Sequence, residues 1–167
     1  MNKKITLLLF SLAALALLLF IFYRDRKKDE IIIIRENHPF RKDGELFFLA
    51  ENRSDTLVKL DIEIARDQEA INRGLMNRDL LPANAGMLFI FPSAELRTFW
   101  MKNTRIPLDI LFIGENREIL YIIHHATPYS TDPLPGFHPS GFVVEVNAGF
   151  CRKNEIKEGQ FIQFKNR

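Results

Sequence analysis

The residues best equipped for chemistry lie in one short stretch, which starts at the only tryptophan of the chain, Trp100. Lys102, Asn103 and Thr104 follow it almost at once. An aromatic face, a positive charge and hydrogen-bonding groups are the usual elements of a small-molecule site. Asn103 and Thr104 are also good turn-closing residues, which bond backbone groups between two strands. The stretch therefore predicts either a ligand site or a polar corner that closes the fold.

Asp109 follows within the apolar run Ile106–Ile113. On a strand, both faces of this run would be largely apolar, so we expect Asp109 to be partly buried. A buried carboxylate needs a cation or several hydrogen-bond donors. Lys102, Arg105 or Arg73 would supply the cation, and the ion pair would pin a hairpin. The alternatives are a binding or general-base role, or a solvated charge at a sheet edge.

Glu145 interrupts a second apolar strand, between Val144 and Val146. Two carboxylates on neighbouring strands form an acid and base pair when they lie about 5 to 9.5 Å apart. Asp109 and Glu145 together with Lys102 therefore give one hypothesis, a hydrolase of an envelope polymer. The alternative is a surface-facing glutamate on an edge strand.

The remaining polar candidates carry weaker signals. Arg73 pairs either with an acidic side chain or with a substrate anion. Ser130 and Thr131 stand in a proline-rich loop as ligand contacts, without the sequence context of a nucleophile. The adjacent His124 and His125 would point to opposite faces of a strand, so they cannot easily share one metal ion. We predict neither a metal site nor a cofactor.

The elements that must position these residues are mostly strands. Residues 59–64 alternate polar and apolar side chains, which predicts a half-buried strand with one wet face. Asp67 predicts the start of a helix at Gln68, and Pro82 limits it to about Asn77. Asp43 and Gly44 indicate a hairpin turn, residues 51–55 a second turn, and residues 150–157 a short helix. Further strands are expected at 31–34, 87–91, 106–113, 118–125, 142–146 and 161–164.

A long irregular loop, Ala126–Ser140, is expected because it contains four prolines, and it would cover or edge the site. Seven or eight short strands with one or two short helices predict a mainly β domain. We expect a jelly-roll-like sandwich or a small barrel.

The N-terminal segment indicates in which compartment the domain lies. Lys3 and Lys4 precede the apolar run Ile5–Tyr23, which is long enough to span a membrane. It predicts an uncleaved transmembrane anchor, residues 1–23, followed by a charged linker, residues 24–30, and one β-rich domain, residues 31–167. The alternative is a signal peptide and secretion after its cleavage.

Basic residues flank both ends of the apolar run, so charge alone does not orient it. A single N-terminal anchor before a compact domain usually serves for export, which favours a periplasmic or cell-surface domain. The net charge of +2 and the lack of a basic stripe in the sequence argue against a nucleic-acid partner.

Several short motifs resemble those of a prokaryotic family, the domain of unknown function numbered 192. The resemblance covers about Thr56–Phe164 and rests on residues 74–76, 86–89, 99–104, 106–109 and 128–131. It implies a mainly β domain with one helix, of jelly-roll-like type, often behind an N-terminal export segment. It implies no established activity.

We therefore expect a binding or accessory module of the cell envelope, tethered to the membrane through Ile5–Tyr23. Its partner would be a small molecule, a glycan or an envelope protein. The alternatives are the envelope hydrolase described above and a purely structural signature with no ligand site.

Overall fold

The computed structural model describes residues 14–24 and 39–167. The chain divides into two compact units, Met1–Asn37 and His38–Arg167, and the described part of the first is helical. Among the described residues, no helix is both long enough and apolar enough to cross a membrane. The first part of the predicted anchor lies outside the described residues. Most of the linker and the strand expected at Ile31–Ile34 lie outside them as well. These remain predictions.

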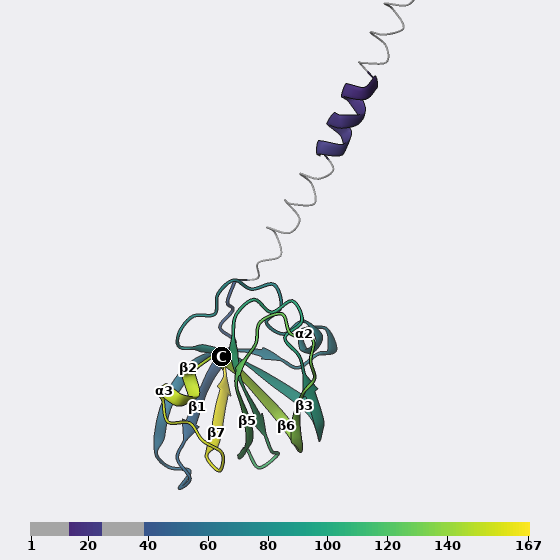
Figure 1. Ribbon diagram of the computed structural model, residues 1–167. Helices are drawn as coiled ribbons and strands as arrows, with labels where there is room; N and C mark the ends of the chain where they lie inside the picture. Colours follow the sequence, from purple (N-terminus) through teal and green to yellow (C-terminus); the bar gives the residue numbers. More distant parts are fainter. Residues whose placement is uncertain (1–13, 25–38) are drawn as a thin grey trace, which may run out of the picture. The chain divides into compact units, whose positions relative to one another are not determined.

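The second unit is built from seven strands and two short helices (Figure 1). The elements in chain order are β1 (Gly44–Leu49), β2 (Thr56–Ala65), α2 (Gln68–Arg73), β3 (Ala85–Phe99), β4 (Leu108–Ile113), β5 (Ile119–Ala126), β6 (Leu134–Asn147), α3 (Phe150–Lys153) and β7 (Phe161–Asn166). All seven strands belong to one sheet in the order β5-β4-β6-β3-β2-β1-β7. The mainly β prediction is confirmed, but the two-sheet sandwich is wrong because a single sheet holds these strands.

The sheet curls so that the start of β5 touches the start of β7, although the two edge strands do not pair along their length. Glu118, just before β5, forms an isolated bridge with Phe161 at the start of β7. Ile119 N–H donates to the Gln160 carbonyl at 2.8 Å, and Ile162 N–H donates to the Arg117 carbonyl at 2.9 Å. The sheet is therefore a curled half-barrel, closer to the predicted small barrel than to a sandwich.

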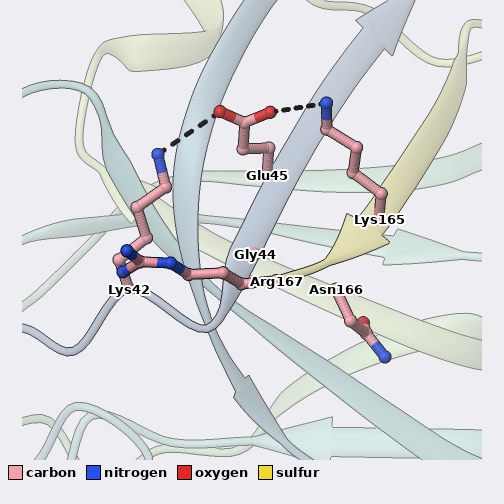
Figure 2. A pocket seen from close by; sticks show the side chains of 6 residues that line it. All are labelled: Lys42, Gly44, Glu45, Lys165, Asn166 and Arg167. Atoms are coloured by element: carbon pink, nitrogen blue, oxygen red, sulfur yellow. Dashed lines mark hydrogen bonds and ion pairs between the residues drawn. The ribbon is translucent and has the colours of Figure 1, made fainter.

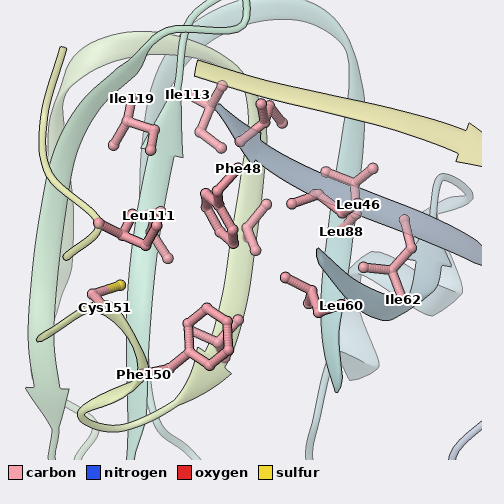
Figure 3. Close-up of a cluster of buried hydrophobic side chains, with 14 of the residues drawn as sticks. Leu46, Phe48, Leu60, Ile62, Leu88, Leu111, Ile113, Ile119, Phe150 and Cys151 are labelled. Atoms are coloured by element: carbon pink, nitrogen blue, oxygen red, sulfur yellow. The ribbon is translucent and has the colours of Figure 1, made fainter. Parts of the chain in front are cut away.

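Two apolar clusters cover the two faces of the sheet. The inner cluster takes side chains from all seven strands and from α3, with Phe48, Leu111 and Phe150 among them (Figure 3). The outer cluster lies on the other face, around Met87 and Phe89. We call these the inner and outer faces. Burial of the two clusters stabilises the curled sheet.

Helix α2 belongs to the outer face. Strands β2 and β3 are parallel neighbours, and such strands need a crossover connection, which here contains α2. Asp67 caps the helix by accepting from the Ala70 N–H at 2.8 Å, as predicted. The helix ends earlier than predicted, at Arg73, because Gly74 turns the chain with φ 49°.

The other local predictions are confirmed in part. The strand at 59–64 and the turn at 51–55 are confirmed, as are the strands at 118–125 and 161–164. The hairpin at Asp43–Gly44 is wrong: residues 39–43 form no strand, and β1 begins at Gly44. The irregular loop expected at Ala126–Ser140 is shorter than predicted, because β5 extends to Ala126 and β6 already begins at Leu134.

The prolines of β6 lie where the strand has one neighbour. Pro135 and Pro139 pair with the far half of β3, at Thr98 and Leu96, whereas β4 pairs only with residues 142–147. A proline lacks the N–H that a central strand must donate, but an edge leaves that position free. Strand β6 therefore extends as an edge before it enters the middle of the sheet.

Candidate functional site

A row of four residues crosses the outer face in register. Glu63 of β2 pairs with Met87 of β3, Met87 pairs with Glu145 of β6, and Glu145 pairs with Ile110 of β4. Residues that pair directly across neighbouring strands point to the same face. Two buried glutamates, each 4 % exposed, therefore lie on the same face on either side of Met87.

Glu63 is held in a buried ion pair. Both of its carboxylate oxygens accept from Arg78, each at 2.6 Å, and Oε1 also accepts from the Arg41 backbone N–H at 2.8 Å. Arg78 is itself 5 % exposed. The prediction that Glu63 would lie on a wet face is wrong, because the segment after α2 folds back over it. Nothing in the local sequence links positions 63 and 78.

Glu145 has a different environment. In the described part of the chain, no group forms a hydrogen bond with its Oε2 atom. Burial raises the pKa of Glu145 to about 8, so the side chain carries a proton at neutral pH. The expectation of a surface-facing glutamate on an edge strand is wrong, because residue 145 lies where β6 is flanked by β3 and β4.

Gly74 lies next to the Glu145 carboxyl. A β-carbon at position 74 would come 4.0 Å from Glu145 Oε2 and 3.4 Å from the Phe89 ring. Gly74 has no such carbon, so that space is free beside the unpaired oxygen. With φ at 49°, the position also favours glycine on backbone grounds.

Asp109 lies on the opposite face. It pairs with Val146, a member of the inner cluster, and it is 0 % exposed. Its oxygens accept three backbone N–H groups at 3.0 Å each, from His125, Gly149 and Cys151. Asp109 therefore fastens the start of α3 to β4 and β5, and burial together with its charge raises the pKa of the Cys151 thiol.

The arginines predicted as the cation for Asp109 pair elsewhere, and the nearest basic nitrogens are the Nδ1 atoms of His124 and His125, each 3.9 Å from Oδ1. Arg105 pairs with Asp79 at 2.6 Å, and Arg73 pairs with Glu69 at 3.0 Å. The donors are backbone N–H groups, and the predicted hairpin is also wrong because β6 lies between β3 and β4. Asp109 and Glu145 lie on opposite faces, so the acid and base pair of the hydrolase hypothesis is wrong as well.

The corner after β3 separates packing residues from exposed ones. Met101 is fully buried, whereas Trp100 is 50 % exposed and Lys102 lies with its Nζ atom 5.2 Å from the Trp100 ring centroid. Asn103 adopts φ 56°, and its carbonyl accepts from the Asn77 N–H at 2.8 Å. The corner is thereby joined to the segment that follows α2.

Thr104 and Ser130 belong to the support of this corner. Thr104 is buried, and its carbonyl accepts from the Tyr129 N–H at 3.0 Å. The Ser130 carbonyl accepts from the Met101 N–H at 2.9 Å, and its hydroxyl bonds Asp132. Thr131 is exposed in the same loop.

Two clefts open on the two sides of α2. The first, of about 440 Å³, we call the Trp100 cleft. Its walls are Gln68, Ile71, Asn72, Phe91, Pro92, Leu96, Arg97, Thr98, Phe99 and Trp100. The second, of about 370 Å³, we call the arginine cleft. Its walls include Phe40, Arg41, Glu63, Ala70, Arg73, Gly74, Arg78 and Met87.

The structure thus divides the predicted site residues between several places. Trp100 lines one cleft and Arg73 the other, while Glu145 lies beside Gly74 of the arginine cleft. Ser130 and Thr131 line neither cleft. Among the described residues, no three side chains of the metal-binding types gather into a site.

A third hollow, of about 350 Å³, lies at the edge of the sheet where β1 meets β7 (Figure 2). Glu45 accepts there from Lys165 at 2.9 Å, from Lys59 at 3.1 Å and from Lys42 at 3.3 Å. These three ammonium groups lower the pKa of Glu45 to about 2. Glu45 and these three lysines are thus already paired with one another.

Comparison with known proteins agrees with the motifs. The model of the DUF192 family, described as "Uncharacterized ACR, COG1430", matches residues 49–164, which is more than half of the chain. The chain belongs to this family. The predicted resemblance is confirmed, and Gly74, Trp100, Asp109 and Glu145 all lie within the matched part. No curated protein matches.

Two solved structures share the DUF192 fold of this chain. One, from Sinorhizobium meliloti 1021 and described as a "putative transcription regulator", is 29 % identical with a TM-score of 0.70. The alignment covers 76 % of this chain and 98 % of that one. The other, a protein of unknown function from Novosphingobium aromaticivorans DSM 12444, is 33 % identical with a TM-score of 0.69, over 76 % of this chain and 90 % of that one.

Proposed function

We propose that this chain is a membrane-tethered binding module of the cell envelope, and that its ligand is a glycan held in the Trp100 cleft. The observation that carries the proposal is the composition of that cleft. An open hollow of about 440 Å³ places a half-exposed tryptophan beside two phenylalanines and two amide side chains. Ligand sites are mostly apolar hollows of this size with a few convergent polar groups.

The chemistry of the cleft suits a sugar better than an ion. The half-exposed Trp100 ring offers a flat apolar surface to the C–H face of a sugar ring, with Phe99 beside it in the wall. Gln68 and Asn72 of α2 each carry both a donor and an acceptor, which matches hydroxyl groups. The Arg97 guanidinium lies 4.1 Å from the Phe91 ring centroid and is thereby held in the wall.

The tether and the compartment are supported by sequence alone. The apolar run Ile5–Tyr23 is long enough to span a membrane and follows two lysines. An anchor of this kind would hold the domain at the outer side of the membrane, among envelope polymers. Digestion of intact cells by an added protease tests it: loss of the domain supports the proposed side, and full protection contradicts it.

A role in transcription regulation, which the description of the Sinorhizobium protein names, receives less support here. The net charge of the chain is +2, and affinity for nucleic acid rests mainly on basic side chains that contact phosphates. We therefore keep the glycan as the proposed ligand.

The only tryptophan makes a direct test possible. The full chain in detergent micelles is titrated with the tetramer of N-acetylglucosamine while the Trp100 fluorescence is recorded. We expect a saturable change in intensity. Calorimetry should then show that Trp100→Ala weakens binding by at least about tenfold, as expected for a central aromatic contact.

Two variants control for effects on the fold. Gln68→Ala should weaken binding with little change in the melting temperature. Leu57→Ala, at an exposed position of β2 away from the cleft, should leave binding unchanged. Equal affinity of Trp100→Ala and the unaltered chain, or no saturable signal, would contradict the proposed site.

A further inference from the structure

Three arginines line the arginine cleft, and each is paired with a carboxylate: Arg41 with Asp43, Arg73 with Glu69 and Arg78 with Glu63. The side chain of Arg73 is 41 % exposed and its partner Glu69 is 86 % exposed. Exposed pairs of this kind hold together only weakly, so Arg73 can exchange its partner for a ligand at little cost.

Arg78 contributes an unused donor. Its two terminal nitrogens bond Glu63, but its Nε atom has no hydrogen-bond partner in the described part of the chain. A guanidinium has only donors, so the group that completes it must be an acceptor. Buried polar atoms are normally paired, which makes this orphan a pointer to a missing acceptor.

Glu145 supplies a second orphan beside the same cleft. A β-carbon at Gly74 would lie 4.0 Å from Glu145 Oε2, which is van der Waals contact, so a ligand oxygen has to reach beyond that position to accept a hydrogen bond from Glu145. A carboxyl that holds its proton presents an O–H donor there. The weakly held guanidinium of Arg73 and the unpartnered Nε atom of Arg78 are donors, and a Glu145 carboxyl that holds its proton donates as well.

We propose that the arginine cleft binds a small organic carboxylate, which accepts hydrogen bonds from the guanidinium groups of Arg73 and Arg78 and from the carboxyl of Glu145 beside Gly74. A bare inorganic anion fits less well, because Phe40, Ala70 and Met87 make part of the wall apolar. An apolar body on the ligand would contact these residues. This site is distinct from the Trp100 cleft and independent of the proposed function.

The site should lose its ligand as Glu145 loses its proton. Glu145 faces Met87 and Phe89 of β3, Ile110 of β4 and Gly74. None of these residues titrates. The charged groups of the same row and of the segment above it are Glu63, Arg78 and Arg73, and the Glu145→Gln variant isolates the contribution of Glu145 from theirs.

Benzoate is a suitable probe because it is ionised throughout this range and has an apolar ring. We expect calorimetry on the full chain in detergent to detect benzoate binding at pH 6.5. Affinity should fall about tenfold by pH 9, because a carboxyl with a pKa of about 8 is then about nine-tenths ionised. Neutral benzamide should not bind.

Variants separate this mechanism from a general anion site. Glu145→Gln keeps a donor without titrating, so its affinity at pH 6.5 should be retained and its fall by pH 9 lost. Arg73→Met should weaken binding about tenfold. Arg97→Lys in the Trp100 cleft and Trp100→Ala should leave benzoate binding unchanged.

Several results would overturn the inference. These are no benzoate binding at pH 6.5, an affinity that does not change with pH, or the same fall in the Glu145→Gln variant. Sulfate binding as tight as benzoate would also overturn it, since the apolar wall would then contribute nothing. Melting curves of each variant establish that a loss of binding is not a loss of fold.

Discussion

Asp109 and Glu145 are buried carboxylates on neighbouring strands, β4 and β6, and their surroundings differ almost completely. Asp109, on the inner face, accepts three backbone N–H groups. Glu145, on the outer face, leaves one oxygen without a partner in the described part of the chain, and burial raises its pKa to about 8. Equal burial therefore does not mean an equal role.

The difference indicates which carboxylate is available for a ligand. A group with all its hydrogen bonds made inside the fold has nothing left to offer. A carboxyl that is desolvated and incompletely bonded lowers the stability of the fold, and such groups gather at functional sites. Glu63 is intermediate between a fully bonded and an incompletely bonded carboxylate, because Arg78 neutralises its charge in a buried ion pair.

The largest expected effect comes from removing the Asp109 carboxylate. Asp109→Ala leaves three buried N–H groups without an acceptor, and each costs about 1–3 kcal/mol. We therefore expect a loss of about 5 kcal/mol, a large part of the stability of an ordinary domain. Urea denaturation followed by circular dichroism measures it.

Asp132→Ala is the matched control, because Asp132 is exposed in a loop. It should change the free energy of unfolding by less than about 0.5 kcal/mol. A loss below about 1 kcal/mol for Asp109→Ala would mean that the three donors find other partners. The contrast between the two carboxylates would then fail.

The second largest effect is expected at the ion pair of Glu63. Arg78→Met leaves a buried carboxylate without its cation, which should cost about 4 kcal/mol. Arg105→Met removes a more exposed arginine from its pair with Asp79 and should cost less than about 1 kcal/mol. Urea denaturation of both variants at pH 7 gives the comparison.

A double variant shows whether the uncompensated charge is the cause. Adding Glu63→Gln to Arg78→Met should recover about half of the loss, because the amide has no charge to leave unpaired. If the double variant is no more stable than the single one, lost packing of the arginine stem explains the effect instead.

These pairings mark the limit of what the sequence could predict. The alternation of residues 59–64 and the cap at Asp67 are local signals, and both predicted their elements correctly. The same alternation assigned Glu63 to the wet face, because the arginine that buries it lies fifteen positions away. The bonding of Asp109 similarly depends on residues 40 and 42 positions further on.

The sequence predicted individual residues of the candidate site, but not which of them lie close together in the fold. Asp109 and Glu145 were both recognisable as polar interruptions of apolar strands. Only the pairing of β4 with β6 shows that they face opposite sides. Arg78 had no local signal, and the role of Gly74 depends on the placement of Glu145 behind it.

An effect of similar size, but of the opposite sign, is expected at Glu145. Its pKa is raised in the folded state, so the folded protein binds more protons than the unfolded chain between about pH 4.5 and 8. Stability contributed by this group is therefore lost as the pH rises through that window. Glu145→Gln should stabilise the protein by about 4 kcal/mol at pH 8, since the amide needs no proton.

The pH profile distinguishes this cause from better packing. The gain from Glu145→Gln should become small near pH 4.5, where the glutamate is protonated in the folded state and half protonated in the unfolded chain. Glu51→Gln, in an exposed turn, should show no such profile. A gain that is equal at pH 4.5 and pH 8, or a loss at both, would contradict the assignment of a neutral Glu145.

The smallest effect is expected at Glu45, a carboxylate whose charge is balanced by three lysines at the surface. Three lysines lower its pKa to about 2, so its stabilising contribution is present above about pH 4.5 and is lost as the pH falls towards 2. Glu45→Gln should reduce stability only slightly at pH 7, and high salt should abolish the difference because exposed charges are screened. Thermal melts at low and high salt test this. A large loss that survives high salt would show that Glu45, like Asp109, acts through fixed hydrogen bonds and not through a screened charge cluster.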